Sequence, residues 1–212
     1  MLSLEVIAVL LVGYLLGSIP FAVIFAKQRG IDVYSVGSGN PGATNVTRHV
    51  GKWIGRGVFV LDFLKGLLAT QWFRWDFLVE EPYKNPEFLG MCGMLAAVVG
   101  HSYPVFSRFR GGKGVATAMG ALIAVMQIPL FVGLLVWAGF FFSLRFVSLA
   151  SIAFGLSLPL TVFFEGLFRS GDGHYVKVAF AAALAFWILF RHRSNILRLL
   201  EGSEDRFSSK PD

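Results

Sequence analysis

Long apolar runs dominate this sequence and constrain its fold more than any other feature. Only 15% of the 212 residues are charged, compared with about 25% in a typical soluble domain. A chain of this size cannot bury so much apolar surface in a core of its own, which excludes a soluble enzyme and a disordered protein. We therefore predict an all-α integral membrane protein, a bundle of seven transmembrane helices over 2–26, 53–73, 87–106, 114–128, 129–144, 146–165 and 174–192.

The fourth and fifth runs are short, and only Gln127, Ile128 and Pro129 separate them. One kinked helix is the alternative to two helices at this point. The two runs together would form a helix of roughly 45 Å, which is too long for a single span. Two helices are therefore preferred, and the count is seven.

The basic residues indicate the orientation of these helices. Loops on one side of the predicted bundle carry 14 Lys and Arg residues, whereas loops on the other side carry 4. Because cytoplasmic loops are enriched in Lys and Arg, the N-terminus is predicted outside and the C-terminus in the cytoplasm. The net charge of +6 then reflects membrane topology, and no nucleic-acid partner is predicted.

Three polar or Gly-rich stretches fall on the predicted cytoplasmic side, and the first reads SVGSGNPGATNVTR (35–48). Glycines allow backbone N–H groups to point at an anion, while hydroxyl, amide and guanidinium side chains add donors. An ordinary Gly/Pro turn is the alternative, but a turn needs only one or two such residues. We predict an anion site that includes Gly37, Ser38, Gly39, Asn40, Thr44, Asn45 and Arg48.

The second stretch, FRGGKGVAT (109–117), resembles a phosphate loop. It is not a Walker A motif, because no Ser or Thr follows Gly112-Lys113. We expect Gly111, Gly112 and Gly114 to present backbone donors at the start of a helix, with Lys113 adding a positive charge. The alternative is a flexible basic loop between two spans.

The third stretch, RHRSNILRLLEGSE (191–204), follows the last predicted span and places His192, Asn195 and Arg198 at near-helical spacing. An end helix that binds lipid headgroups is the alternative, and we prefer it for Arg191 and Arg193. His192 is a candidate for a hydrogen bond to phosphate or for a general base, because imidazole titrates near neutral pH.

Two charged residues, Asp62 and Lys65, lie inside the second predicted span. Because they are three residues apart on one helix face, mutual pairing is the least costly arrangement, although contact with a loop or a ligand is an alternative. His101, at the end of the third run, is either a site residue or a capping residue.

Several classes of catalytic site are absent from the sequence. No His is followed by Asp five residues later, so the H-x4-D acyltransferase dyad is missing, and there is no G-x-S-x-G nucleophile elbow. The single cysteine, Cys92, excludes a disulfide framework and a Cys-rich metal site. No His and carboxylate cluster has metal-ligand spacing, so we predict neither a metal nor a cofactor.

At these residues the sequence resembles the bacterial acyl-phosphate:glycerol-3-phosphate acyltransferases of the PlsY type. The resemblance covers nearly the whole chain, which predicts one transmembrane domain over 1–204 and a short solvated tail over 205–212. It is carried by three motifs in order, GSGNPGATNVTR (37–48), VGHSYPVFSRFRGGKGVAT (99–117) and HRSNILRLLEGSE (192–204), and by GSIPFAVIFAK, LDFLKG and RFVSLAS.

The resemblance implies transfer of an acyl group from acyl phosphate to the 1-hydroxyl of sn-glycerol 3-phosphate, giving lysophosphatidic acid and phosphate in the bacterial inner membrane. The partners would be these two substrates and membrane lipids; no oligomeric state is predicted. Either His192 or a phosphate oxygen of the donor would act as the base. The implied site residues are Ser38, Asn40, Asn45, Arg48, Gly112, Lys113, Thr117, Ser148, Ser151, His192, Asn195 and Glu204.

A small transporter of organic phosphates is the alternative function, because broken helices and buried charges also suit a transporter. A transporter usually has an internal repeat and motifs near the middle of the membrane, whereas this chain has neither. A purely structural subunit would not need three anion-suited stretches.

Overall fold

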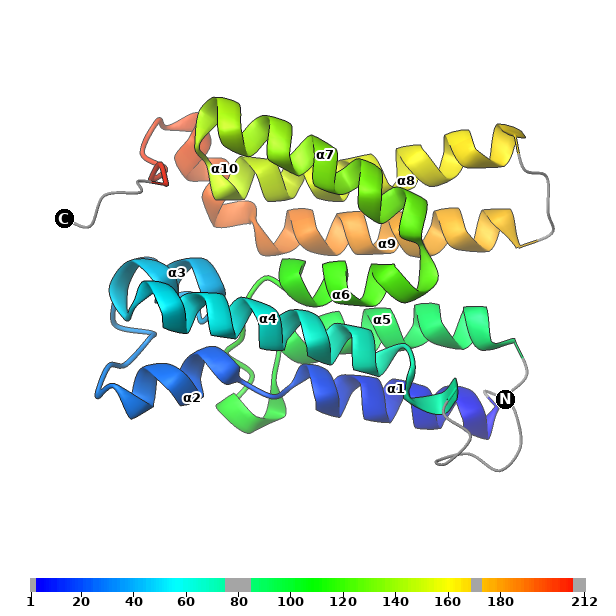
Figure 1. Ribbon diagram of the computed structural model, residues 1–212, viewed down its shortest axis with the longest axis horizontal. Helices are drawn as coiled ribbons and strands as arrows, with labels where there is room; N and C mark the ends of the chain where they lie inside the picture. The colour runs from blue at the N-terminus through cyan, green and yellow to red at the C-terminus, as the bar shows by residue number, and fades with distance from the viewer. Residues whose placement is uncertain (1–2, 75–84, 169–172, 208–212) are drawn as a thin grey trace. The chain divides into compact units, whose positions relative to one another are not determined.

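The computed structural model describes residues 3–74, 85–168 and 173–207, and every regular element in these ranges is helical (Figure 1). The predicted all-α class is therefore confirmed. Two short 3₁₀ turns lie at Trp72–Arg74 and Val105–Ser107. The α-helices are α1 (Leu4–Gly17), α2 (Phe21–Gln28), α3 (Ala43–His49), α4 (Lys52–Ala69), α5 (Pro86–Ser102), α6 (Val115–Val125), α7 (Gln127–Leu144), α8 (Val147–Phe168), α9 (His174–Arg191) and α10 (Arg193–Leu200).

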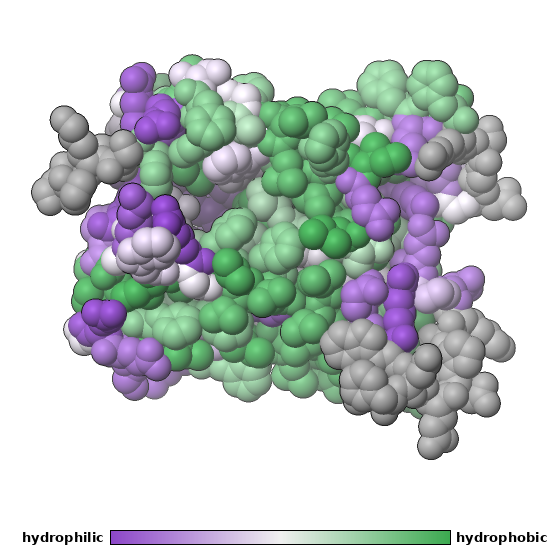
Figure 2. Space-filling view, viewed as in Figure 1, coloured by the Kyte–Doolittle hydropathy of each residue, from purple (hydrophilic) through white to green (hydrophobic). Residues whose placement is uncertain are grey.

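Five helical segments in the described ranges are long and apolar enough to cross a membrane: Leu4–Gln28, Pro86–Ser107, Gln127–Leu144, Val147–Phe168 and His174–Arg191. Many of their large apolar side chains are exposed, including Leu11, Phe131 and Phe186. On the face drawn in Figure 2, apolar side chains cover the middle of the helices and polar side chains gather near the helix ends. This distribution suits a lipid environment.

The predicted second and fourth spans correspond to α4 and α6, which are not among these five segments. Helix α4 contains buried charged residues, and α6 has only 11 residues. The break predicted between the fourth and fifth runs is present, because the backbone of Met126 is non-helical (φ −149°, ψ 70°) between α6 and α7. Pro129 lies in the first turn of α7, where its missing N–H breaks no helical hydrogen bond.

The chain forms two compact units, Met1–Val125 and Met126–Asp212. In the first unit, α1 packs against α5 and α4 packs against α6. Small residues allow close approach: a Cβ at Gly66 of α4 would overlap with the Thr117 carbonyl of α6, and one at Gly120 would overlap with the Phe63 carbonyl. This packing fixes the helix that follows the second motif.

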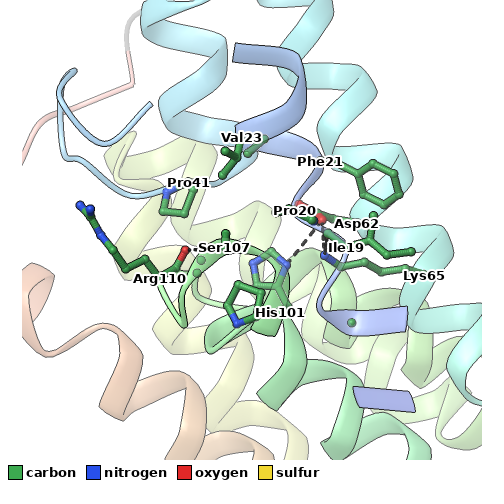
Figure 3. Close-up of a pocket in the computed structure, with 15 residues that line it drawn as sticks. Ile19, Pro20, Phe21, Val23, Pro41, Asp62, Lys65, His101, Ser107 and Arg110 are labelled. Atoms are coloured by element: carbon green, nitrogen blue, oxygen red, sulfur yellow. Dashed lines mark hydrogen bonds and ion pairs between the residues drawn. The ribbon is translucent and has the colours of Figure 1, made fainter. Parts of the chain in front are cut away.

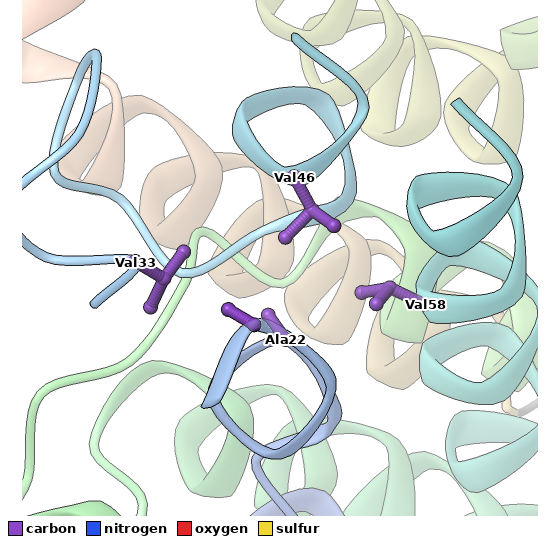
Figure 4. Packing of buried hydrophobic residues seen from close by; sticks show 5 residues of the cluster. Ala22, Val33, Val46 and Val58 are labelled. Atoms are coloured by element: carbon purple, nitrogen blue, oxygen red, sulfur yellow. The ribbon is translucent and has the colours of Figure 1, made fainter. Parts of the chain in front are cut away.

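A small apolar cluster in the first unit fixes the segment that carries the first motif. It joins α2, the loop that follows it, α3 and α4 through Ala22, Ala26, Val33, Val46 and Val58, all of them buried (Figure 4). Because Val33 lies just before the motif and Val46 within α3, the loop between them is held at both ends.

In the second unit, α8 packs against both α7 and α9, and α10 contacts α8 and α9. The backbone N–H of Phe207 donates to the Arg145 carbonyl over 2.7 Å, and the Phe207 ring packs edge-on against Phe141. Residues 208–212 of the predicted tail lie outside the described ranges. The predicted single domain and its solvated tail stay predictions.

Candidate active site

The first motif forms a tight loop that leads into α3. Gly37 and Gly39 have φ angles of 53° and 63°, in the left-handed region that favours glycine. A Cβ at Gly37 would also overlap with the His49 ring, so this position has no space for a side chain. Ser38 between the two glycines is exposed, and its Oγ lies 3.4 Å from the backbone N–H of Asn40. The backbone N–H groups of Gly39 and Gly42 donate to carbonyls of the loop itself, so the anion site predicted here stays a prediction.

The Asn45 side chain fixes this loop by hydrogen bonds to its backbone. Its side chain is buried, and its Nδ2 donates to the carbonyls of Val33 (3.2 Å) and Val36 (3.1 Å). Its Oδ1 accepts the N–H of Ser38 over 3.2 Å. These contacts are all to the protein, so the geometry gives Asn45 a positioning role. Arg48, one turn further along α3, is exposed, and Thr44 is half-buried.

The second motif lies at the start of α6, as predicted. The N–H of Gly112 donates to the His101 carbonyl (3.1 Å), and Gly114 has a φ of 82°. The Gly114 carbonyl accepts the first helical bond, from Ala118, so the loop leads directly into the helix N-terminus. Lys113 is half-buried between the two glycines. A lysine and the positive end of a helix therefore coincide here, whereas the Gly112 N–H, predicted as an anion donor, is bonded to His101.

Tyr34 and Arg110 connect the two loops. The Tyr34 hydroxyl donates to the Arg110 carbonyl over 2.7 Å, and the Arg110 guanidinium lies 4.1 Å from the centre of the Tyr34 ring. The structure thereby brings the first and second motifs together within one unit. Sequence reasoning missed this pair, because the tyrosine lies before the first glycine run and its partner is 76 positions away.

A buried charged cluster of Asp62, Lys65 and His101 lies beside the second motif (Figure 3). The Asp62 Oδ1 is 2.7 Å from the Lys65 Nζ and 3.5 Å from the His101 Nδ1. Lys65 also donates to the carbonyl of Ile19, at the break between α1 and α2, over 2.9 Å. The predicted pairing of Asp62 with Lys65 is confirmed. A small pocket beside the cluster, with space for about one water molecule, is also lined by Gly111 and Gly112.

The third motif gathers its side chains around one carboxylate in the second unit. Glu204 Oε1 accepts from the Ser148 hydroxyl (2.5 Å) and from the Asn195 Nδ2 (2.7 Å), and its Oε2 accepts from the Arg198 Nε (2.8 Å). Burial raises the pKa of Glu204, but these hydrogen bonds and the Arg198 charge outweigh it, so the net pKa lies below the ordinary value. A carboxylate with these partners orients α10 and the segment after it.

His192 is buried at the junction of α9 and α10. Its Nδ1 lies 2.8 Å from the Ile188 carbonyl. A carbonyl oxygen only accepts, so this nitrogen carries a proton and Nε2 is the acceptor nitrogen in the neutral ring. Ser151, predicted beside it in the site, donates to the Val147 carbonyl of its own helix over 2.7 Å.

No group of three or more His, Cys, Asp or Glu side chains suited to a metal ion occurs in the described ranges. The motifs carry hydroxyl groups and cationic side chains, which are groups that bind anions.

Comparison with known proteins shows which family this chain belongs to. The family model described as glycerol-3-phosphate acyltransferase matches residues 7–202. The chain belongs to the glycerol-3-phosphate acyltransferase family. Among its relatives, the glycerol-3-phosphate acyltransferase of Aquifex aeolicus is 48% identical over 200 residues, with 92% of this chain and 95% of the relative covered. That of Hydrogenobaculum sp. is 43% identical, with 92% and 93% covered.

Solved structures of this family are similar as well. The crystal structure of PlsY, an integral membrane glycerol 3-phosphate acyltransferase, in its glycerol 3-phosphate form matches with a TM-score of 0.82 and 42% sequence identity, covering 96% of each chain. The lysophosphatidic acid form of PlsY matches with a TM-score of 0.79 at the same identity and coverage. The predicted resemblance to the PlsY type is confirmed.

Proposed function

We propose that this protein transfers an acyl chain from acyl phosphate to the 1-hydroxyl of sn-glycerol 3-phosphate, producing lysophosphatidic acid and inorganic phosphate. The observation that carries the proposal is the pair of joined glycine loops, one followed by Arg48 and the other containing Lys113. Both substrates carry a phosphate, so a site for this reaction needs two anion-binding elements. The family membership and the two ligand forms of PlsY support the same reaction.

The reaction needs no nucleophilic side chain. The substrate hydroxyl oxygen bonds to the acyl carbon, the bond from that carbon to the bridging phosphate oxygen breaks, and phosphate leaves with the electron pair. Because acyl phosphate is already activated, the protein has to align the two substrates and stabilise the charge that develops. Donors on rigid glycine loops suit this role.

We assign the site residues in two groups. Those in contact with substrate are Ser38, Arg48, Lys113, His192 and Asn195, with binding contributions from Gly37, Gly39, Asn40, Thr44, Gly111, Gly112 and Gly114. Those that shape the site are Asn45, Thr117, Ser148, Ser151 and Glu204, and Asn195 also does so through its bond to Glu204.

The hydroxyl proton passes either to an oxygen of the donor phosphate or to the Nε2 of His192. We favour the donor phosphate, because the chain has no H-x4-D dyad. kcat measured against pH at saturating substrates separates the two. The ratio kcat/KM would not, because the substrate phosphates themselves titrate near pH 6. We expect wild type and His192→Ala to share one pH profile. A wild-type acid limb that disappears in His192→Ala, with a fall in kcat of roughly 10²–10⁴, would identify His192 as the base.

We also propose seven membrane spans, an outside N-terminus and a cytoplasmic active site in the bacterial inner membrane. The excess of Lys and Arg in alternate loops supports this orientation. Helices α4 and α6 would then be the two further spans, with α6 crossing only part of the bilayer as a regular helix.

Reconstitution in lipid vesicles tests the activity against the transporter alternative. With labelled glycerol 3-phosphate and acyl phosphate, we expect the label in a lipid-soluble ester and one phosphate released for each ester formed. Label that accumulates inside the vesicles as unchanged glycerol 3-phosphate would instead favour a transporter.

A further inference from the structure

The buried charged cluster of Asp62, Lys65 and His101, beside the second motif, has no part in the reaction described above. Asp62 is 2% exposed, Lys65 is 3% exposed and His101 is 8% exposed. Burying charged groups is costly unless they are paired, and here Asp62 lies against both of the other side chains. Lys65 is further tied to the Ile19 carbonyl. The imidazole of His101 is thus fixed from the side of Asp62.

The opposite edge of the His101 ring faces the glycine loop. A Cβ at Gly112 would overlap with the His101 Nε2. The backbone of Gly112 is outside the left-handed region, so its conformation alone would accept alanine. The absence of a side chain at this position is therefore explained by the His101 ring and not by the backbone angles.

His101 also contacts the loop through its backbone. Its carbonyl accepts the N–H of Gly112, and a Cβ at Gly111 would overlap with the same carbonyl. The loop thus lies directly on this residue, on both its side chain and its main chain. Because Lys113 follows immediately, the position of His101 constrains the backbone from which the lysine side chain extends.

We propose that His101, held by Asp62 and Lys65, is a positioning residue that fixes the Gly111–Gly112 backbone for phosphate binding. This inference rests on the proposed function, because it takes the second motif to hold a substrate phosphate. It predicts that Asp62 acts on the loop through His101, and that Gly112 must lack a side chain because of the His101 ring.

The central variant is His101→Asn, which keeps an amide on the side of Asp62 and removes the ring edge that faces Gly112. We expect it to raise the KM of one substrate about tenfold, with kcat changed less than threefold. Thr70→Val is the matched control, because Thr70 is the fully buried residue that caps the C-terminus of α4 and its hydroxyl donates to the carbonyls of Leu67 and Gly66. It should lower the melting temperature without raising either KM.

A double variant gives the decisive comparison. Gly112→Ala should raise the same KM at least tenfold in the wild-type background and less than twofold when added to His101→Asn, since the smaller side chain leaves room for a methyl group. Asp62→Asn should likewise add less than twofold to His101→Asn. Effects that multiply in either pair, or a kcat loss with unchanged KM values, would overturn the positioning role.

Thermal unfolding distinguishes a failure of this inference from a failure of the proposed function. Gly112→Ala should lower the melting temperature in the wild-type background but not in His101→Asn. A wild-type protein that lacks the acyltransferase activity would refute the proposed function. Equal decreases in melting temperature in both backgrounds would instead refute the contact between Gly112 and the His101 ring.

Discussion

At the scale of single residues, the charged side chains divide into two groups. Arg48 is exposed and Lys113 is half-buried, and both lie on loops suited to anions. Asp62 and Glu204 instead have cationic partners within their own units, at 2.7 and 2.8 Å. The first group is expected to carry substrate binding, and the second group to carry the geometry and stability of the site.

Removing a phosphate-binding cation should therefore impair catalysis without unfolding the protein. Arg48→Ala and Lys113→Ala should each lose a charge-assisted contact of about 1.5–3 kcal/mol, or roughly 10- to 150-fold in kcat/KM. Arg193→Ala is the control, because Arg193 is exposed and lies over the Phe190 ring. Equal losses for all three variants at normal expression would mean that general basicity, not a defined site, carries the effect.

Glu204 should make stability depend on pH in the acid range. Its pKa is lower in the folded protein than in the unfolded chain, so it stabilises the fold above its ordinary pKa of about 4.3 and loses this effect as pH falls through the lower, folded value. At pH 7, Glu204→Gln should have a lower melting temperature than wild type. This difference in melting temperature should become smaller below about pH 4.5.

The exposed Glu201, three residues earlier, provides the control for this measurement, and Glu201→Gln should leave the melting temperature nearly unchanged. A difference between wild type and Glu204→Gln that stays constant as the pH falls from 7 through the lower, folded pKa would contradict the assigned contacts.

At the scale of helices, the sequence predicts the elements well and their contacts poorly. Apolar runs located α5, α7, α8 and α9, because a helix in lipid needs an uninterrupted apolar stretch, and the break before α7 followed from length alone. Helix α6 is shorter than its apolar run (114–128), since Gly114 still belongs to the loop and Met126 interrupts the helix before α7.

The side-chain contacts at the site were less accessible to sequence reasoning. The spacing of Asp62 and Lys65 predicts their pair, because both lie on one helix. The link between Tyr34 and Arg110 joins distant loops, and the partners of Glu204 come from two helices. Such contacts depend on tertiary packing, and no local pattern in the chain encodes them.

Close packing of α4 against α6 should depend on one glycine of α4 and not on another. Gly66→Ala should destabilise the protein by roughly 1–3 kcal/mol, since its methyl group would overlap with the Thr117 backbone. Gly57→Ala, on the same helix with no heavy atom within 4 Å of the added Cβ, should be neutral or stabilise by about 0.5–1 kcal/mol. Unfolding followed in detergent checks this, and similar melting temperatures for the two variants would contradict the described packing.

At the scale of the whole molecule, a membrane-embedded chain suits a reaction between a water-soluble substrate and a lipid-like one. Glycerol 3-phosphate reaches the protein from water, whereas an acyl phosphate carries a long apolar tail that favours the bilayer. Polar motifs at helix ends, beside apolar helices, suit a reaction in which one substrate comes from each phase.

The central claim is that acyl phosphate is the acyl donor, and the most direct test compares donors on one preparation of purified protein. Labelled glycerol 3-phosphate is supplied with acyl phosphate in one reaction and with acyl-CoA in another, and the lipid-soluble label is measured over time. We predict that label enters lysophosphatidic acid with acyl phosphate and not with acyl-CoA. Label that enters lipid only with acyl-CoA, or with neither donor, would contradict the account.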